Sequence, residues 1–316
     1  MRQGGASARR VRAVAAAALA VLALALAAGC GSSDGQGDRP TIAATTPVLG
    51  SLVRDLVGDR AEVVVIIPDG ADPHEHQPSA KDAETLASAD LAVENGLDLE
   101  EGLEDVLARA REDGVPVVTA TDHVTLREAG ADEATGDEEH GHGPEDPHVW
   151  MDPLAMADLV AALAPVVRDE LGIDVSARAA DLDARLQTLN AELEDALAAI
   201  PQDRRRLVTG HESMGYFADR YGFALVGALV PSLSSQAQVS ASSLSALRDQ
   251  VRAEGVPAIF NEVGTPDGVA AAIADETGAR VVDVPTHTLP DDGSYFTFMR
   301  EVADAVADGL GGPAAR

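Results

Sequence analysis

The sequence predicts an α/β protein made of two similar lobes, each a mainly parallel four-stranded sheet with flanking helices, joined by one long rigid helix. Two observations lead to this fold class. Short β-type runs alternate with segments of helical spacing in both halves of the chain, and such alternation is typical of parallel sheets covered by helices. Between the halves, residues 175–200 contain no Gly or Pro and carry one apolar face, which predicts a continuous helix.

The first lobe is predicted over residues 41–173 and the second over residues 202–316. In the first lobe the strand candidates are 41–46, 61–67, 91–95 and 115–120, and the helix candidates are 48–57, 80–89 and 99–110. In the second lobe the strand candidates are 206–210, 224–229, 258–262 and 280–284, and the helix candidates are 243–253 and 269–277. A chain of 316 residues is long enough for two such cores.

The segment that joins the lobes, residues 174–201, is predicted to be a single helix. Its apolar residues recur at steps of three or four and mark one face, namely Leu182, Leu186, Leu189, Leu193, Leu197 and Ile200. At ~1.5 Å per residue, the part of this helix over 175–200 would be about 39 Å long, enough to run along both lobes. A rod of this kind permits only small motion of one lobe relative to the other.

The first 29 residues have the features of a signal peptide. A basic start is followed by an apolar run over 13–28 and a small-residue exit, the order found in signal peptides. The run is short for a membrane span, which needs ~20 residues; an N-terminal anchor with an incidental cysteine is the alternative. The sequence Leu-Ala-Ala-Gly-Cys at 26–30 resembles the lipobox of bacterial lipoproteins. That resemblance implies cleavage before Cys30 and lipidation of Cys30. The segment that follows is rich in Gly, Ser and Asp and has no periodicity, which predicts a flexible tether over 30–40.

Composition excludes several kinds of partner and of metal site. The chain has 53 Asp and Glu against 23 Lys and Arg, a formal net charge of −30, which argues against nucleic acid or anionic lipid as a partner. Cys30 is the only cysteine, so neither an intramolecular disulfide nor a thiolate zinc site can form. Any metal chemistry must use His, Asp or Glu.

Four of the eight histidines occur where a site is expected: His74, His148, His211 and His287. Each follows a predicted strand or immediately precedes a predicted helix, and ligands in α/β folds gather at the carboxyl ends of strands. Neutral imidazole suits Zn²⁺, Cu²⁺ or Ni²⁺, whereas Mg²⁺ and Ca²⁺ prefer oxygen ligands. One such histidine alone would more often be structural or exposed, but four at equivalent positions predict a transition-metal site.

Five segments, in order along the chain, resemble one family: 68–75, 89–100, 146–153, 211–217 and 259–262. The family is that of the zinc and manganese solute-binding lipoproteins of ABC transporters, whose lobes are joined by a rigid helix. The resemblance covers nearly the whole chain after the signal peptide. It implies two four-stranded α/β lobes with the metal bound between them.

The resemblance also implies a ligand set. His74 and His148 match the two ligands of the first lobe, and His211 matches the first ligand of the second lobe. Manganese-type members usually place Glu at this third position, so His211 favours Zn²⁺ over Mn²⁺. The fourth family ligand is an Asp, but this chain has Thr-His-Thr-Leu at 286–289. Three alternatives stay open: His287 is the fourth ligand, Asp291 or Asp292 replaces it, or three ligands bind together with water.

Further residues near these motifs are secondary candidates. His76 is expected beside the ligands or at the rim of the site. Glu262 is a candidate to hydrogen-bond a ligand imidazole and fix its tautomer, the alternative being a strand-end carboxylate that caps the next helix. The segment 130–146 is an acidic loop with His140 and His142, either a weak metal-collecting loop or simply a solvated one.

The function expected from these features is that of an extracytoplasmic protein, lipid-anchored to the outer face of the cell membrane. It would capture Zn²⁺ between its lobes as a monomer and deliver the ion to an ABC permease and its ATPase. One alternative is a surface adhesin stabilised by its metal. Another is a secreted zinc hydrolase with Glu212 or Glu262 as general base, but the chain has no His-Glu-x-x-His motif, so we expect no enzyme.

Overall fold

The computed structural model describes residues 39–129, 145–266 and 268–311. The predicted signal peptide, Cys30, the tether up to residue 38, and His140 and His142 lie outside these ranges. The folded body begins at Pro40, and it is described by itself below. None of the helices within the described ranges has both the length and the apolar composition needed to cross a membrane.

The sheet of the first lobe has four parallel strands in the order β2-β1-β3-β4. The strands are β1 (Thr41–Ala44), β2 (Glu62–Val65), β3 (Leu91–Glu94) and β4 (Val117–Thr119). Side chains alternate between two apolar clusters: Ile42 and Val93 face one, whereas Ala43 and Ala92 face the other. Burial on both faces is typical of parallel sheets, so the predicted strands and their parallel arrangement are confirmed.

Helices cover both faces of this sheet. They are α2 (Pro47–Val57), α3 (Ala80–Ser88) and α4 (Glu104–Glu112), with α3 packed against α4. The start of α2 is set by Thr46, whose hydroxyl accepts the Leu49 N–H at 3.4 Å, and by Pro47 in the first turn. Gly58, with φ of 58°, ends it.

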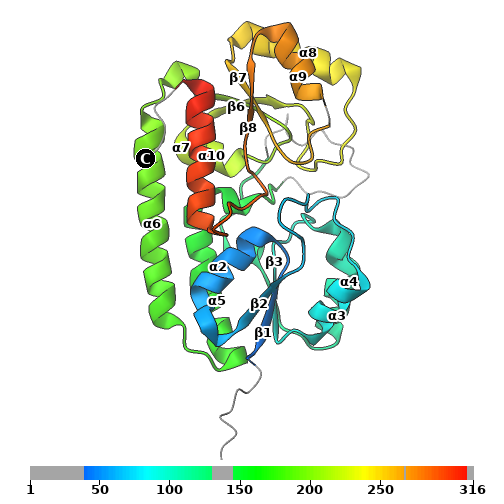
Figure 1. Cartoon of the computed structure of the whole chain (residues 1–316), viewed down its shortest axis with the longest axis vertical. Helices are drawn as coiled ribbons and strands as arrows, with labels where there is room; N and C mark the ends of the chain where they lie inside the picture. Colours follow the sequence, from blue (N-terminus) through cyan, green and yellow to red (C-terminus); the bar gives the residue numbers. More distant parts are fainter. Residues whose placement is uncertain (1–38, 130–144, 267, 312–316) are drawn as a thin grey trace, which may run out of the picture. The chain divides into compact units, whose positions relative to one another are not determined.

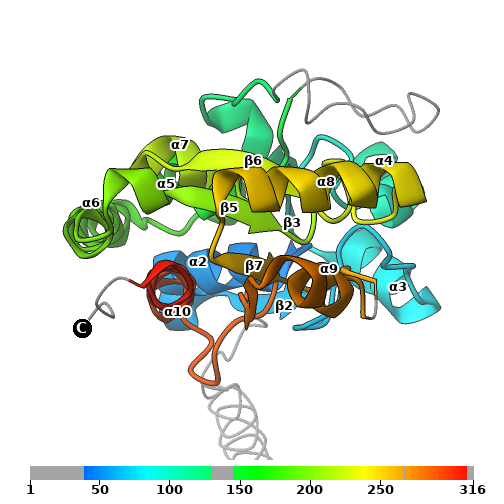
Figure 2. The same cartoon turned by 90° about the horizontal axis from the view of Figure 1, so that it is seen from above.

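The second lobe has four parallel strands in two hydrogen-bonded pairs. The strands are β5 (Arg206–Thr209), β6 (Ala224–Ala228), β7 (Ala258–Asn261) and β8 (Arg280–Asp283), and the helices are α7 (Gly215–Tyr221), α8 (Ala241–Glu254) and α9 (Val269–Thr277). β5 lies between β6 and β7 (Figure 2). Among the described strands of this lobe, backbone hydrogen bonds pair β5 with β6 and β7 with β8, and no ladder joins β5 to β7. Within the described ranges, a continuous four-stranded sheet is therefore found only in the first lobe. The register of β5 and β6 shifts between Leu207 and Val208, which pair with Leu225 and Gly227. Val226 is therefore the extra residue of a bulge in β6, and bulges bend and twist a strand.

Three long helices lie along one side of the body: α5 (Pro153–Leu171), α6 (Ser176–Ala198) and α10 (Tyr295–Leu310) (Figure 1). α6 contacts α2 of the first lobe as well as α7 and α10 of the second. Its five predicted core leucines are all buried: Leu182, Leu186, Leu189, Leu193 and Leu197. The helix is shorter than predicted at both ends, about 35 Å at ~1.5 Å per residue. Bounds for α5, α7 and α10 were not predicted from the sequence.

α10 provides a second link between the lobes. The Ser51 hydroxyl in α2 donates to the Gly293 carbonyl at 2.8 Å and accepts the Tyr295 N–H at 3.0 Å. The Tyr295 hydroxyl donates to the Trp150 carbonyl at 2.8 Å. One apolar cluster therefore runs from β1 through α6 to α10.

Candidate metal centre

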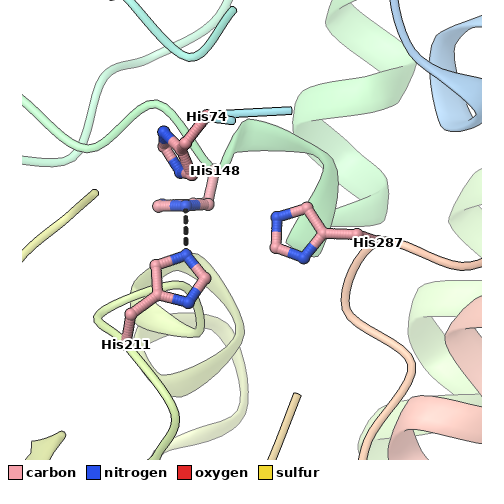
Figure 3. Close-up of side chains that lie close together, drawn as sticks. All are labelled: His74, His148, His211 and His287. Carbon is pink, nitrogen blue, oxygen red and sulfur yellow. Dashed lines mark hydrogen bonds between the residues drawn. The ribbon is translucent and has the colours of Figure 1, made fainter. Parts of the chain in front are cut away.

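Four histidines meet between the two lobes (Figure 3). Each of His74, His148, His211 and His287 offers one ring nitrogen, and these four atoms lie within 4.8 Å of one another. All four side chains are buried, with His148 fully covered and His287, at 5% exposure, the most accessible. The structure therefore brings together the four residues that the sequence analysis singled out.

Chain topology explains this meeting. His74 follows β2, His211 follows β5 and His287 follows β8, while His148 immediately precedes the short 3₁₀ helix Val149–Met151 and α5. Two histidines come from each predicted lobe. Because parallel strands point the same way, the segments that follow them converge at one edge of each sheet.

One close pair of ring nitrogens spans the two lobes. Nε2 of His211 lies 3.2 Å from Nε2 of His148. The rings of His211 and His287 are nearly parallel, at 21° with centroids 5.6 Å apart, and His74 meets His148 edge-on with centroids 5.6 Å apart. Two nitrogens at this separation must either share a proton or share a cation.

Asp146 is hydrogen-bonded to both the ring and the backbone of His148. Nδ1 of His148 lies 2.8 Å from Oδ1 of Asp146, and the backbone N–H of His148 donates to the same oxygen at 2.9 Å. The other Asp146 oxygen accepts from Nη1 of Arg127 at 3.2 Å. Burial lowers the pKa of His148 despite the carboxylate, so the neutral ring donates through Nδ1 and presents the Nε2 lone pair to the cluster.

Glu262 contacts His211 and also Thr286, the residue before His287. Its Oε1 accepts the His211 backbone N–H at 2.9 Å and lies 3.3 Å from His211 Nδ1, within ion-pair distance but outside hydrogen-bond geometry. The hydroxyls of Ser213 and Thr286 donate to its Oε2, each at 2.6 Å. Burial raises the pKa of Glu262, but His211 more than offsets this and brings it to about 2. Burial lowers the pKa of His211, and Glu262 outweighs burial and raises it.

His287 is neutral and points one nitrogen into the cluster. Burial and the neighbouring His211 lower the pKa of His287 to about 3. Its Nδ1 lies 2.9 Å from the Thr286 hydroxyl, whereas Nε2 has no hydrogen-bond partner within the described ranges. The Trp150 ring contacts the rings of both His287 and His148, at centroid distances of 5.4 and 5.3 Å.

Asp72 connects His74 to the second lobe. Its Oδ1 accepts the His74 backbone N–H at 3.0 Å, and its Oδ2 accepts the Ser235 hydroxyl at 2.6 Å. The Gln236 side chain donates to the His74 carbonyl. Gly264 approaches closely, since a Cβ there would lie 2.4 Å from Asp72 Oδ2.

The roles of Asp72 and Asp146 were not predicted, although the sequence contains a signal for them. Asp-Pro-His occurs twice, at 72–74 and 146–148. In both copies Asp Oδ1 accepts the N–H of the residue two positions on, the local turn that Asp side chains favour. In each copy of the tripeptide, the Asp side chain thus fixes the backbone at the histidine.

The secondary candidates lie outside the four-membered group. His76 is partly exposed with Nε2 4.0 Å from Asp82, and Glu212 is buried. Asp291 and Asp292 are exposed, and Asp292 binds the Ser294 N–H at 2.9 Å ahead of α10. Among the alternatives for a fourth ligand, only His287 belongs to the cluster.

The fold and this cluster define a two-lobed binding protein with a site for a transition metal. The family model described as zinc-uptake complex component A, periplasmic, matches residues 42–309, and the chain belongs to this family. The family comprises solute-binding proteins of metal ABC importers and not enzymes, which overturns the hydrolase alternative.

Relatives of both metal types are similar to this chain. The manganese-binding lipoprotein MntA of Halalkalibacterium halodurans is 28% identical over 288 residues, covering 88% of this chain and 90% of the relative. The high-affinity zinc uptake system protein ZnuA of Paracoccus denitrificans is 28% identical over 308 residues, covering 86% and 92%. The structure of the periplasmic zinc-binding protein TroA from Treponema pallidum has a similar fold, with a TM-score of 0.75, 23% identity and coverage of 86% and 99%.

Proposed function

We propose that this protein captures Zn²⁺ between its lobes and delivers it to a membrane permease driven by its ATPase. The observation that carries the proposal is the meeting of four histidine nitrogens within 4.8 Å. The ion is the cargo of the protein, and no chemistry on it is required.

The spacing of the nitrogens supports a tetrahedral ion. Zn–N bonds of ~2.0–2.1 Å at tetrahedral angles place ligand nitrogens about 3.3 Å apart, and the His148 and His211 pair is separated by 3.2 Å. Since the whole group extends to 4.8 Å, binding would draw the remaining nitrogens inward. His74 and His287 are therefore the ligands expected to move.

The donor set supports Zn²⁺ rather than Mn²⁺. Mn²⁺ favours carboxylate, carbonyl and water ligands, whereas imidazole suits Zn²⁺, Cu²⁺ and Ni²⁺. Within the described ranges, the group contains four imidazoles and no carboxylate oxygen. The names of the relatives point to both manganese and zinc, so the preference rests on the donor set of this chain.

The negative charge near the site comes from carboxylates that contact the ligand histidines. A ligand set of neutral imidazoles brings no negative charge of its own to a dication. In the structure Glu262 and Asp146, both buried, lie against His211 and His148. Such carboxylates orient ligand imidazoles and increase their basicity. The negative charge that balances the ion is therefore on Glu262 and Asp146 and not on the ligands themselves.

The cellular setting of this proposal is extracytoplasmic, with the acylated Cys30 as the membrane anchor and residues 30–40 as the tether. Relatives named as lipoproteins support the anchor. We further propose that the protein acts as a monomer with domains at 41–173, 174–201 and 202–316. The comparisons do not favour the adhesin alternative.

Competition calorimetry with metal-free protein tests the proposal. We expect about one tightly bound Zn²⁺ per chain and much weaker binding of Mn²⁺. A preference for Mn²⁺ would reverse the assignment of the cargo, and the absence of any tight site would refute the metal centre itself.

A further inference from the structure

A buried chain of three side chains runs from a carboxylate to the cluster. Glu262 Oε2 lies 2.6 Å from the Thr286 hydroxyl oxygen, which lies 2.9 Å from His287 Nδ1. Thr286 is completely buried, and Glu262 and His287 are 6% and 5% exposed. Bulk water is thus largely kept from these polar atoms.

The direction of the protons in this chain follows from the hydrogen bonds that Glu262 accepts. Its Oε2 accepts from the Ser213 and Thr286 hydroxyls at 2.6 Å each, and its Oε1 accepts the His211 N–H at 2.9 Å, so the carboxylate is the acceptor towards Thr286. Thr286 has one hydroxyl proton, and it is donated to Glu262. Towards His287 the Thr286 oxygen can therefore only accept, so the proton of the neutral imidazole must be on Nδ1. The lone pair of His287 then lies on Nε2, the nitrogen without a hydrogen-bond partner within the described ranges.

We propose that Thr286 is a positioning residue: its hydroxyl relays the Glu262 charge to His287 and selects the tautomer that presents Nε2 as the fourth metal ligand. The inference rests on the proposed function, which it deepens by naming how His287 is prepared for the ion. Nothing in it requires His287 to change its protonation state.

The backbone of Thr286 is held in place independently of this relay. Nε1 of Trp150, from the first lobe, donates to the Thr286 carbonyl at 2.9 Å, and the Thr286 N–H donates to the Val284 carbonyl at 3.0 Å. These contacts fix the peptide on both sides. Replacing only the Thr286 hydroxyl should therefore leave the loop and the position of His287 in place.

A comparison with the other histidines shows why a relay is needed. Asp146 reaches His148 Nδ1 directly at 2.8 Å, and Glu262 lies 3.3 Å from His211 Nδ1. No carboxylate forms a direct hydrogen bond with His287 within the described ranges. A hydroxyl placed between Glu262 and His287 extends one carboxylate to a second imidazole.

The first test measures the tautomer itself. In metal-free protein labelled with ¹⁵N-histidine, nitrogen NMR should show His287 protonated on Nδ1 near neutral pH, with the signal assigned by its loss in His287→Gln. In Thr286→Val, which keeps the shape but lacks the hydroxyl, this preference should weaken or reverse. Thr286→Ser should restore it.

The second test measures Zn²⁺ affinity with a matched control. Loss of an outer partner typically costs about 10- to 100-fold in metal affinity, so Thr286→Val should weaken Zn²⁺ binding by this factor and Thr286→Ser should recover most of it. Ser213→Ala is the control, because Ser213 donates to the same Glu262 oxygen at the same 2.6 Å but contacts no histidine ring through its hydroxyl. This control should remain within a few fold of the unmodified protein.

The outcomes separate the inference from the proposed function. If the unmodified protein lacks a tight Zn²⁺ site, the proposed function fails, while the tautomer in metal-free protein still decides the inference. His287 protonated on Nε2 in the metal-free protein would overturn the relay. Equal losses of affinity in Thr286→Val and Ser213→Ala would also overturn it, because the effect would then come from Glu262 alone. If Thr286→Val does not fold, the unmodified protein and Thr286→Ser suffice for the tautomer test.

Discussion

Asp72 of the first lobe accepts a 2.6 Å hydrogen bond from the Ser235 hydroxyl of the second lobe. The same carboxylate holds the backbone at His74. The lobes are therefore connected beside the cluster by protein groups alone, and metal ligation adds to an existing contact.

This contact predicts an effect of Ser235→Ala on metal release. A hydrogen bond to a charged group contributes about 1.5–3 kcal/mol, so its loss should favour separation of the lobes. We expect faster Zn²⁺ dissociation, measured by stopped-flow mixing with a chelator. Ser234→Ala is the control, because the Ser234 hydroxyl accepts only the Gln236 N–H of its own loop at 3.3 Å. Equal dissociation rates for the two variants would contradict the prediction.

Removal of any one ligand should reduce affinity more than it disturbs the fold. His→Ala at each of His74, His148, His211 and His287 should weaken Zn²⁺ binding by at least the roughly 10–100-fold caused by losing an outer partner. Calorimetry measures this directly, and His76→Ala is the matched control outside the cluster. If His211→Ala binds like the unmodified protein, the interlobe site is wrong; if only His287→Ala does so, a water or Asp291 or Asp292 completes the site.

Zinc should also stabilise the folded chain by mass action. Binding contributes about 4 kcal/mol when the free ion is at a thousandfold excess over Kd. For a chain of this size that corresponds to a rise in Tm of about 10 °C, measurable by calorimetric melting with and without Zn²⁺. The four ligand variants should lose most of this shift, and His76→Ala should keep it.

Zinc affinity should fall on acidification with a slope well below four protons. Each histidine must be neutral to bind. The pKa of His211 is raised because Glu262 outweighs burial, whereas burial lowers the pKa of His148 and brings that of His287 to about 3. Protons therefore compete at His211 before they compete at His148 or His287, as pH falls through the raised pKa of His211. A slope approaching four protons in calorimetric titrations over this fall in pH would contradict the prediction.

The lipid anchor predicts the location of a cysteine variant. Cys30→Ser removes the residue expected to carry the acyl chains, so the protein should be released from membranes. Fractionation of cells followed by immunodetection measures the change, with the unmodified chain as the membrane-bound control. A processed variant that stays with the membrane would refute lipidation at Cys30.

The sequence was sufficient to predict the strands and the four histidines for a physical reason. Strand periodicity is local, and parallel strands direct the residues that follow them to a common edge. This places His74, His211 and His287 without knowledge of any side-chain distance. The two Asp-Pro-His turns are also local, because in each the Asp side chain accepts the backbone N–H of the His two residues on. Such a turn can be recognised from the tripeptide alone.

The parts that could not be predicted depend on contacts between distant segments. The Glu262 contact with Thr286 joins a strand end to a loop 24 residues away, and the Asp72 contact with Ser235 spans 163 residues. Neither follows from periodicity. The bulge at Val226 of β6 likewise left no pattern from which it could be predicted, so the second sheet was predicted to be more regular than it is.

The position of α10 affects how the chain acquires its fold during export. α10 is the last helix that the structure describes, yet it packs against α2 near the beginning of the body, and Tyr295 donates its N–H to Ser51. A chain that emerges with its N-terminus first presents the apolar face of α2 long before α10 arrives to cover it. The first lobe therefore gains its complete apolar cover only when the last helix is available, and we expect its stable folding to require the C-terminal segment.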